Sequence, residues 1–329
     1  MYENQSHYYA RTLSWKPTVP HTPLRSKFTF LPMSALILSA MLPAPFAQAE
    51  ESMFGYVYTT DLLPKGAKEV EQWATWRHQK AGGYFDQIDG RTEFEYGLAD
   101  NLQVAFYANY VWSRAYHNGP FGETTPPEPL VYDTPGPDDH YSAKRFVGFS
   151  GEMIYRFWSP YTDPIGVAVY VEPTIGPQFR ELEAKLILQK NFLDDRLTLA
   201  FNYTYAPEWR HVQDEDSPAR WKWDIETDMN LGVAASYRFA PNWSAGFEFL
   251  NEREYTNSYN LAHMANDGYF FGPNIHYGGK KFFVTATFLE QLPWASEHSD
   301  TVPGAIVGRR IYDNDFEKYR LRIKAGWYF

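Results

Sequence analysis

The sequence predicts an all-β fold: a transmembrane, antiparallel, up-and-down β-barrel of about twelve strands. Three observations predict it. Apolar and polar residues alternate in segment after segment, the chain ends on such a segment, and its beginning is typical of an exported protein. Side chains on a strand point alternately to opposite faces, so a period of two makes one apolar and one polar face. In a membrane barrel the apolar face contacts lipid and the polar face lines the interior.

The last twelve residues show the alternation most clearly. Counting back by twos from Phe329, one face holds only apolar residues, and the other face is basic, with Lys318, Arg320, Arg322 and Lys324. The pattern resembles the carboxyl-terminal targeting strand of bacterial outer-membrane β-barrels. That resemblance implies that Trp327 and Phe329 form an assembly signal, and that the barrel-assembly machinery is a partner.

The beginning of the chain predicts export. Arg25 and Lys27 precede an apolar stretch over residues 28–46, which ends in the small-x-small sequence Ala47-Gln48-Ala49. This arrangement is typical of a signal peptide cleaved between Ala49 and Glu50. We therefore expect residues 1–49 to be a leader and signal peptide, with either Met1 or Met33 as the start.

The remaining chain needs another way to cross a membrane. After Glu50 there is no run of about 18 apolar residues, so the sequence predicts no transmembrane helix. A closed barrel is the other structure that satisfies every backbone group in lipid. We expect a periplasmic segment over residues 50–67 and a barrel over residues 68–329, in the outer membrane of a Gram-negative cell and in contact with lipid and lipopolysaccharide.

Composition excludes several other functions. The chain has no cysteine, which excludes thiol catalysis and cysteine-ligated metals. Residues 1–49 hold four basic residues and one acidic residue. The rest of the chain therefore has 26 Lys and Arg against 39 Asp and Glu, a net charge of −13. This balance argues against nucleic acid as a partner. Aromatic residues make up 18% of the chain, which agrees with the two interfacial girdles of a membrane barrel.

The alternation divides the chain into twelve strand-length segments. They are expected near residues 68–79, 84–97, 102–115, 144–158, 165–176, 179–192, 196–205, 223–239, 243–255, 269–277, 281–292 and 318–329. The connections after even-numbered segments are short, whereas most of the others are long, including polar stretches over 116–141 and 206–222. Short periplasmic turns opposite long external loops are typical of these barrels. Pro273 weakens the prediction of a strand over 269–277, because proline has no backbone N–H to donate to a neighbouring strand.

The inward faces carry the candidate functional residues. As lumen-lining residues on a solute path we predict Arg91, Glu93, Glu95, Glu181, Glu183, Lys185, Glu226, Asp228, Glu248, Lys318, Arg320, Arg322 and Lys324. Two interpretations stay open. These charges could satisfy one another and fill a narrow interior, or they could line a polar channel that selects solutes by charge. Closure would place the basic last segment beside Glu69, Glu71 and Arg77 of the first.

No catalytic, metal or cofactor site is predicted. The histidines show no metal-ligand spacing. His276 lies on an expected strand with no Ser two residues away, unlike the His-x-Ser pattern of outer-membrane phospholipases. Glu93 and Glu95 share one face, as paired acids of a glycosidase would, but no nucleophile or oxyanion donor is signalled nearby.

Two segments resemble a known family. The first is Phe54-Gly55-Tyr56-Val57-Tyr58 with Leu63-Pro64-Lys65-Gly66, continuing into residues 69–73; the second is residues 91–98, Arg-Thr-Glu-Phe-Glu-Tyr-Gly-Leu. Together they resemble an uncharacterised family of Gram-negative outer-membrane β-barrel proteins, most clearly over residues 54–110. The resemblance implies the barrel fold and transfers no site.

The sequence therefore favours passive, porin-like passage of small polar solutes, and no enzyme activity. One rival is a structural or adhesive barrel whose lumen is closed by side chains, by residues 50–66 or by folded loops. A less favoured rival is a hydrolase that works at the membrane surface.

Overall fold

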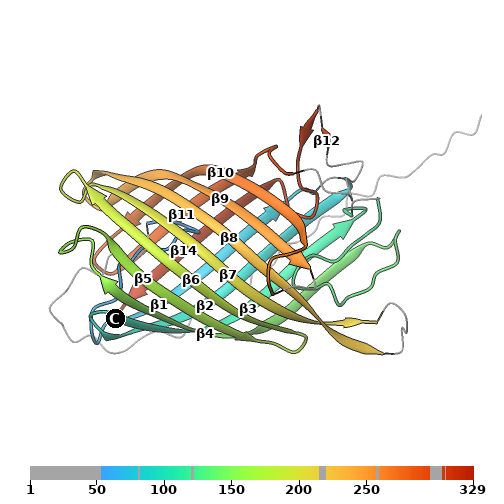
Figure 1. Cartoon of the computed structure of the whole chain (residues 1–329), viewed down its shortest axis with the longest axis horizontal. Helices are drawn as coiled ribbons and strands as arrows, with labels where there is room; N and C mark the ends of the chain where they lie inside the picture. The colour runs from blue at the N-terminus through green and yellow to red at the C-terminus, as the bar shows by residue number, and fades with distance from the viewer. Residues whose placement is uncertain are drawn as a thin grey trace, which may run out of the picture. The chain divides into compact units, whose positions relative to one another are not determined.

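The alternating segments form a closed antiparallel barrel (Figure 1). The structure, a computed structural model, describes residues 53–80, 82–119, 122–214, 220–256, 259–296, 306–307 and 309–329. Each wall strand pairs with its neighbours in sequence, and β14 pairs with both β11 and β1. The twelve wall strands are β1 (Lys68–His78), β2 (Tyr84–Ala99), β3 (Leu102–Tyr116), β4 (Tyr141–Trp158), β5 (Gly166–Ile175), β6 (Phe179–Phe192), β7 (Leu197–Gln213), β8 (Trp221–Ala240), β9 (Trp243–Thr256), β10 (Met264–Gly278), β11 (Phe282–Gln291) and β14 (Tyr319–Tyr328).

The predicted faces are confirmed by burial. On β3, Phe106 is 70% exposed on the outer surface, and the adjacent Tyr107 is 2% exposed inside the barrel. The closing seam follows the same rule: β1 and β14 pair without a break from Glu69 opposite Tyr328 to His78 opposite Tyr319. A register shift of one residue would turn every side chain of a strand to the other face, so the apolar surface fixes the register.

The two ends of the barrel differ. One, here called the short-turn end, carries the connections over residues 100–101, 159–165, 193–196, 241–242 and 279–281. Asn242 there adopts the left-handed conformation, with φ of 66°, which suits a tight two-residue turn. The other, here called the long-loop end, carries the connection over residues 117–140 and the last one, which contains the two-stranded hairpin β12 (Ile306–Val307) and β13 (Arg310–Ile311).

Two expectations about strand length were wrong. Residues 206–222 were expected to be a loop, but β7 continues to Gln213 and pairs with β8 as far as Trp221. Where a strand extends beyond the membrane, its outer side chains no longer contact lipid and need not be apolar. The alternation of apolar and polar residues therefore ends there, although the strand pairing continues. The tenth strand likewise starts at Met264. Pro273 remains within it, and pairing with β11 is interrupted between Phe271 and Asn274.

The outer surface is apolar between two aromatic rims. Trp158, Phe239 and Trp327 lie exposed near the short-turn end, and Trp221 and Trp294 lie exposed at the long-loop end. The middle of the wall presents exposed side chains such as Phe149, Val233, Phe247 and Ile323. This is the distribution that contact with a bilayer requires. Among the described residues, no helix has the length and hydropathy to span a membrane.

Candidate functional site

The lumen is occupied by the segment that precedes the first strand. Residues 53–66, here called the lumen segment, lie inside the wall rather than in the periplasmic position expected for residues 50–67; residues 50–52 lie outside the described part. Phe54 and Val57 are 1% exposed and pack against a cluster of lumen-facing apolar side chains that includes Leu250, Phe270 and Phe316. The core of the barrel is therefore completed by the segment that precedes the first strand.

Glu248 of β9 holds the first part of this segment. Its carboxylate accepts hydrogen bonds from three successive backbone N–H groups, those of Gly55 at 2.7 Å, Tyr56 at 2.8 Å and Val57 at 3.1 Å. It also accepts one from the Thr287 hydroxyl at 2.7 Å. Hydrogen bonds to a charged acceptor are among the stronger ones in proteins, so Glu248 is a principal anchor of the lumen segment.

Side-chain amides from β7, β6 and β3 hold the rest. Asn202 of β7 accepts a bond from the Tyr58 N–H at 2.6 Å and donates one to the Tyr58 carbonyl at 2.9 Å. Gln189 of β6 accepts from the Thr60 N–H at 2.7 Å. Gln103 of β3 accepts from the Leu63 N–H at 2.7 Å. Over residues 55–63 the segment is thus bound by wall side chains rather than by strand pairing, and only near its end does a backbone bond to the wall appear, from the Gly66 N–H to the Gly97 carbonyl of β2 at 2.8 Å.

Gly55 is required where the segment passes close to Thr287 of β11. A Cβ at this position would lie 2.8 Å from the Cβ of Thr287 and 2.5 Å from its Oγ1. No larger residue fits without moving the segment. The sequence signal for this contact was the Phe-Gly-Tyr stretch before the first strand, but a single sequence does not show which wall residues it meets.

The basic face of β14 is engaged with this core. Arg320 is 1% exposed, binds Glu252 at 2.6 Å and also pairs with Glu317. Arg322 donates to the Gly55 carbonyl at 3.0 Å, and its guanidinium stacks over the Tyr56 ring at 3.8 Å.

Lys324 lies 3.3 Å from Glu71 of the neighbouring β1, and Lys318 lies just before β14, over the ring of Tyr312. On this face the charged side chains are therefore paired with one another and with the lumen segment. These contacts favour the interpretation of a filled interior over that of a channel lined by free cations.

The predicted acidic residues fall into several environments. Glu93, Glu95 and Glu248 are buried in the lumen. Glu181 and Asp228 line a larger cavity, described below. The other two form ion pairs with a neighbouring cation: Glu183 with Lys185 at 2.8 Å and Glu226 with Arg210 at 2.5 Å. The predicted cation Arg91 pairs with Glu172 at 3.4 Å.

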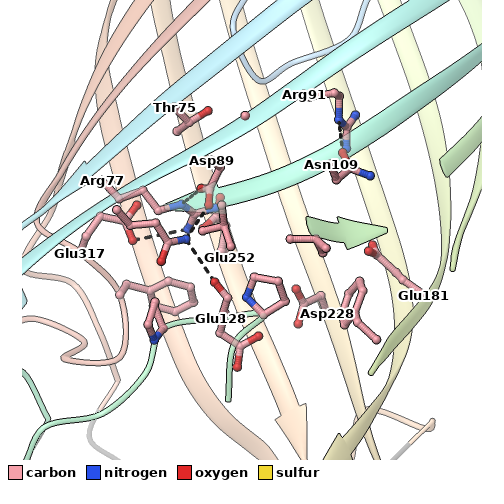
Figure 2. Close-up of a pocket in the computed structure, with 18 of the residues that line it drawn as sticks. Thr75, Arg77, Asp89, Arg91, Asn109, Glu128, Glu181, Asp228, Glu252 and Glu317 are labelled. Carbon is pink, nitrogen blue, oxygen red and sulfur yellow. Dashed lines mark hydrogen bonds and ion pairs between the residues drawn. The ribbon is translucent and has the colours of Figure 1, made fainter. Parts of the chain in front are cut away.

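A cavity of about 340 Å³ remains in the half of the lumen toward the long-loop end (Figure 2). Acidic side chains dominate its lining, with ten carboxylates against the four cations Arg77, Lys80, Arg91 and Arg322. Figure 2 shows Arg77 between Asp89 and Glu317, with Glu181 and Asp228 on the far side. The space suits a small cationic or polyhydroxylated molecule better than an anion.

Two folded loops narrow the barrel at this end. In the loop between β3 and β4, Leu130 is fully buried and packs with Phe85, Val111 and Tyr141. The backbone carbonyl of Glu128, in the same loop, accepts from the Gln87 amide at 3.1 Å, and its carboxylate pairs with Arg210. The sequence predicts a long polar loop here, but its apolar residue Leu130 returns to the lumen.

The loop before β14 holds two carboxyl groups of opposite character. Burial, together with the nearby charge of Asp315, raises the pKa of Asp313 from the ordinary value of 3.8 to about 7. Burial also acts to raise the pKa of Glu317, but the guanidinium groups of Arg320 and Arg77 outweigh it and hold that pKa below its ordinary value. Glu317 therefore serves as the anion of a buried ion pair at neutral pH.

The predicted assembly residues point outward. Trp327 is 52% exposed and Phe329 is 68% exposed, and the Phe329 N–H donates to the Lys68 carbonyl at 3.0 Å across the closing seam. His276 is buried, with Nδ1 2.8 Å from the Thr285 hydroxyl, an arrangement that satisfies the ring inside a wall.

The closed antiparallel wall, its apolar outer surface and its polar interior define an outer-membrane-type β-barrel. The chain belongs to the family of unknown function DUF6662, whose model matches residues 46–329. The resemblance noted in the sequence is thereby confirmed.

A solved structure shows the same fold. An outer-membrane channel of the COG4313 group from Pseudomonas putida F1 superposes with a TM-score of 0.52 at 9% identity, covering 82% of this chain and 98% of that one. The NanC porin gives 0.46 at 9% identity over 78% and 98%. The translocator domain of the autotransporter NalP from Neisseria meningitidis gives 0.45 at 10% over 82% and 91%. At such identities the likeness shows the fold alone. A comparison with curated proteins found no match.

Proposed function

We propose that this chain is an exported outer-membrane protein, cleaved near Ala49, that lets small polar solutes pass, and that the described structure is its closed form. The observation that carries the proposal is the way the lumen segment is bound. Over residues 55–63 its backbone donors bond to side chains of β3, β6, β7 and β9, so this stretch can leave without breaking the strand pairing of the wall. The likeness in fold to a structure described as an outer-membrane channel supports the same function.

The charge of the cavity sets the expected selectivity. Since carboxylates outnumber cations in its lining, cations and cationic solutes should be concentrated there. Short turns face the periplasm in barrels of this kind, so the cavity would open toward the cell exterior. Arg320, Arg322 and Lys324 are bound into the closed core, so a charge reversal there would test folding rather than selectivity.

The test is single-channel conductance in planar bilayers. Wild-type protein should show a low conductance with rare openings. Deletion of residues 51–60 should give sustained, cation-selective current. The matched control is Ser236→Ala, a 1%-exposed residue whose hydroxyl has no hydrogen-bond partner in the described structure, and it should behave as wild type. A folded deletion variant that carries no current would favour a structural or adhesive barrel instead.

A further inference from the structure

Beside the lumen segment lies a second, much smaller cavity, of about 20 Å³. The wall contributes Glu71, Glu93 and Glu95 to its lining, and the lumen segment contributes Thr59 and Asp61. A space of this size holds one water molecule or one metal ion and excludes any organic solute.

The strand register concentrates carboxylates at this place. Glu69 lies directly opposite Glu95, and Glu71 directly opposite Glu93, on the paired strands β1 and β2. The period of two turns all four side chains inward. Like charges on directly opposed residues destabilise a sheet, so the native state needs something between them that offsets the repulsion.

The geometry suits ligation by oxygen. One carboxylate oxygen from each of Glu69, Glu71 and Glu95 lies within 4.8 Å of the other two. These residues are 0%, 0% and 4% exposed. Oxygen ligands at 2.3–2.6 Å from one calcium ion would lie up to about 5 Å apart, so the three atoms can share a single ion.

Glu93 supplies an independent observation. The residue is 2% exposed and lines the same cavity, and its Oε2 has no hydrogen-bond partner among the described residues. Leaving a buried carboxylate oxygen without a partner is costly. A cation in the cavity would satisfy it.

The balance of charge points the same way. Lys324, with its Nζ 3.3 Å from Glu71, lines the cavity together with five carboxylates, those of Asp61, Glu71, Glu93, Glu95 and Glu152. The ligand set contains oxygen alone, which favours a hard cation such as calcium over zinc or copper, which prefer nitrogen and sulfur ligands.

We propose that Glu69, Glu71 and Glu95, with Glu93 beside them, form a buried site for one divalent cation of the calcium class. The sequence places these glutamates on the inward faces of their strands and predicts no metal site. Because Asp61 and Thr59 line the same cavity, the bound ion would also tie the lumen segment to the wall. This last consequence rests on the proposed function, whereas ion binding itself does not.

Terbium, a luminescent substitute for calcium, tests the site directly. Trp73 lines the cavity, so excitation of tryptophan should sensitise terbium emission from the purified, folded barrel. Added calcium should compete the emission away. Glu95→Gln and Glu93→Gln should each weaken terbium binding about 10-fold or more, because each removes a charged oxygen ligand. Heat-modifiable gel mobility verifies that the variants are folded.

The matched control is Asp228→Asn. Asp228 belongs to a second acidic group with Glu226 and Glu254, where Arg210 lies 2.5 Å from Glu226 and already supplies a cation. This variant should keep the wild-type emission. Emission lost in Asp228→Asn but kept in Glu95→Gln, or no calcium-competed emission at all in the wild type, would overturn the site.

Conductance measurements test separately whether ion binding at the cation site also stabilises the closed form. Calcium should reduce the rare openings of the wild type and should have less effect on Glu95→Gln. Terbium binding without any effect of calcium on openings would leave the cation site standing and overturn only its link to closure.

Discussion

At the scale of the residue, Glu248 matters most for the closed form. Its carboxylate lies at the middle of the lumen and accepts bonds from the N–H groups of Gly55, Tyr56 and Val57, and from Asn274 and Thr287 of the wall. Its inward position was predicted from the alternation on its strand. Its partners in the lumen segment were not, because Gly55, Tyr56 and Val57 lie more than 190 positions earlier in the chain and no periodicity links them to Glu248.

Glu248→Ala should lower the free energy of unfolding by about 2–5 kcal/mol, because it leaves several buried donors without an acceptor. Guanidinium unfolding of the refolded barrel, followed by tryptophan fluorescence, measures the change. Ser236→Ala, also buried and inward on the adjacent strand, is the control and should shift the midpoint little. An equal loss in the two variants would show that Glu248 is no special anchor.

Asp313 should make stability depend on pH. Its pKa of about 7 in the folded protein lies above the ordinary 3.8, so the folded protein holds this proton more tightly than the unfolded chain. The stabilisation is complete below about pH 4 and is lost as pH rises to about 7, by about 2–4 kcal/mol. Asp313→Asn should flatten this slope. Identical pH profiles for variant and wild type would rule out the assignment.

At the scale of the element, the wall strands could be predicted well, and the lumen segment and folded loops could not. The sixth strand has its predicted bounds, because its apolar and polar faces persist to both ends. The lumen segment shows no alternation of apolar and polar residues, and its N–H groups donate to side chains of strands that are distant in sequence. The burial of Leu130 could not be predicted either, because a single leucine within a polar loop forms no pattern.

The last strand carries a prediction about assembly. Removal of Phe329, or Trp327→Lys, should reduce the amount of folded barrel more than it reduces the stability of the barrel that does form. Trp327 lies close to the short-turn end, where a cation on the lipid face costs only about 0–1 kcal/mol. The defect would then reflect lost recognition by the assembly machinery.

Ile323→Lys is the matched control, since Ile323 lies on the same outer face but nearer the middle of the strand, 45% exposed. It should lower stability by about 2–4 kcal/mol and leave the terminal signal intact. Heat-modifiable mobility in outer-membrane fractions gives the folded amount for each variant. Normal amounts of folded Trp327→Lys and Phe329-deleted protein would contradict the prediction.

At the scale of the whole molecule, the protein is a polar-lined barrel whose lumen holds the lumen segment and two folded loops. The lumen segment fills the half toward the short turns, and two loops narrow the other half around an acidic cavity. Sequence periodicity predicts a wall and its faces because the bilayer imposes them. The filling of the lumen follows from contacts between distant parts of the chain, so the choice between an open and a closed barrel needed the structure.

The most direct test fastens the lumen segment to the wall. A Cβ on Gly232 would lie 3.0 Å from Cγ2 of Val57, so Val57→Cys with Gly232→Cys places two thiols within reach of a disulfide. The chain has no other cysteine to interfere. Planar-bilayer conductance is then recorded before and after reduction. We predict spontaneous disulfide formation, no current while oxidised, and wild-type openings on reduction. A steady current through the oxidised protein would contradict closure by this segment.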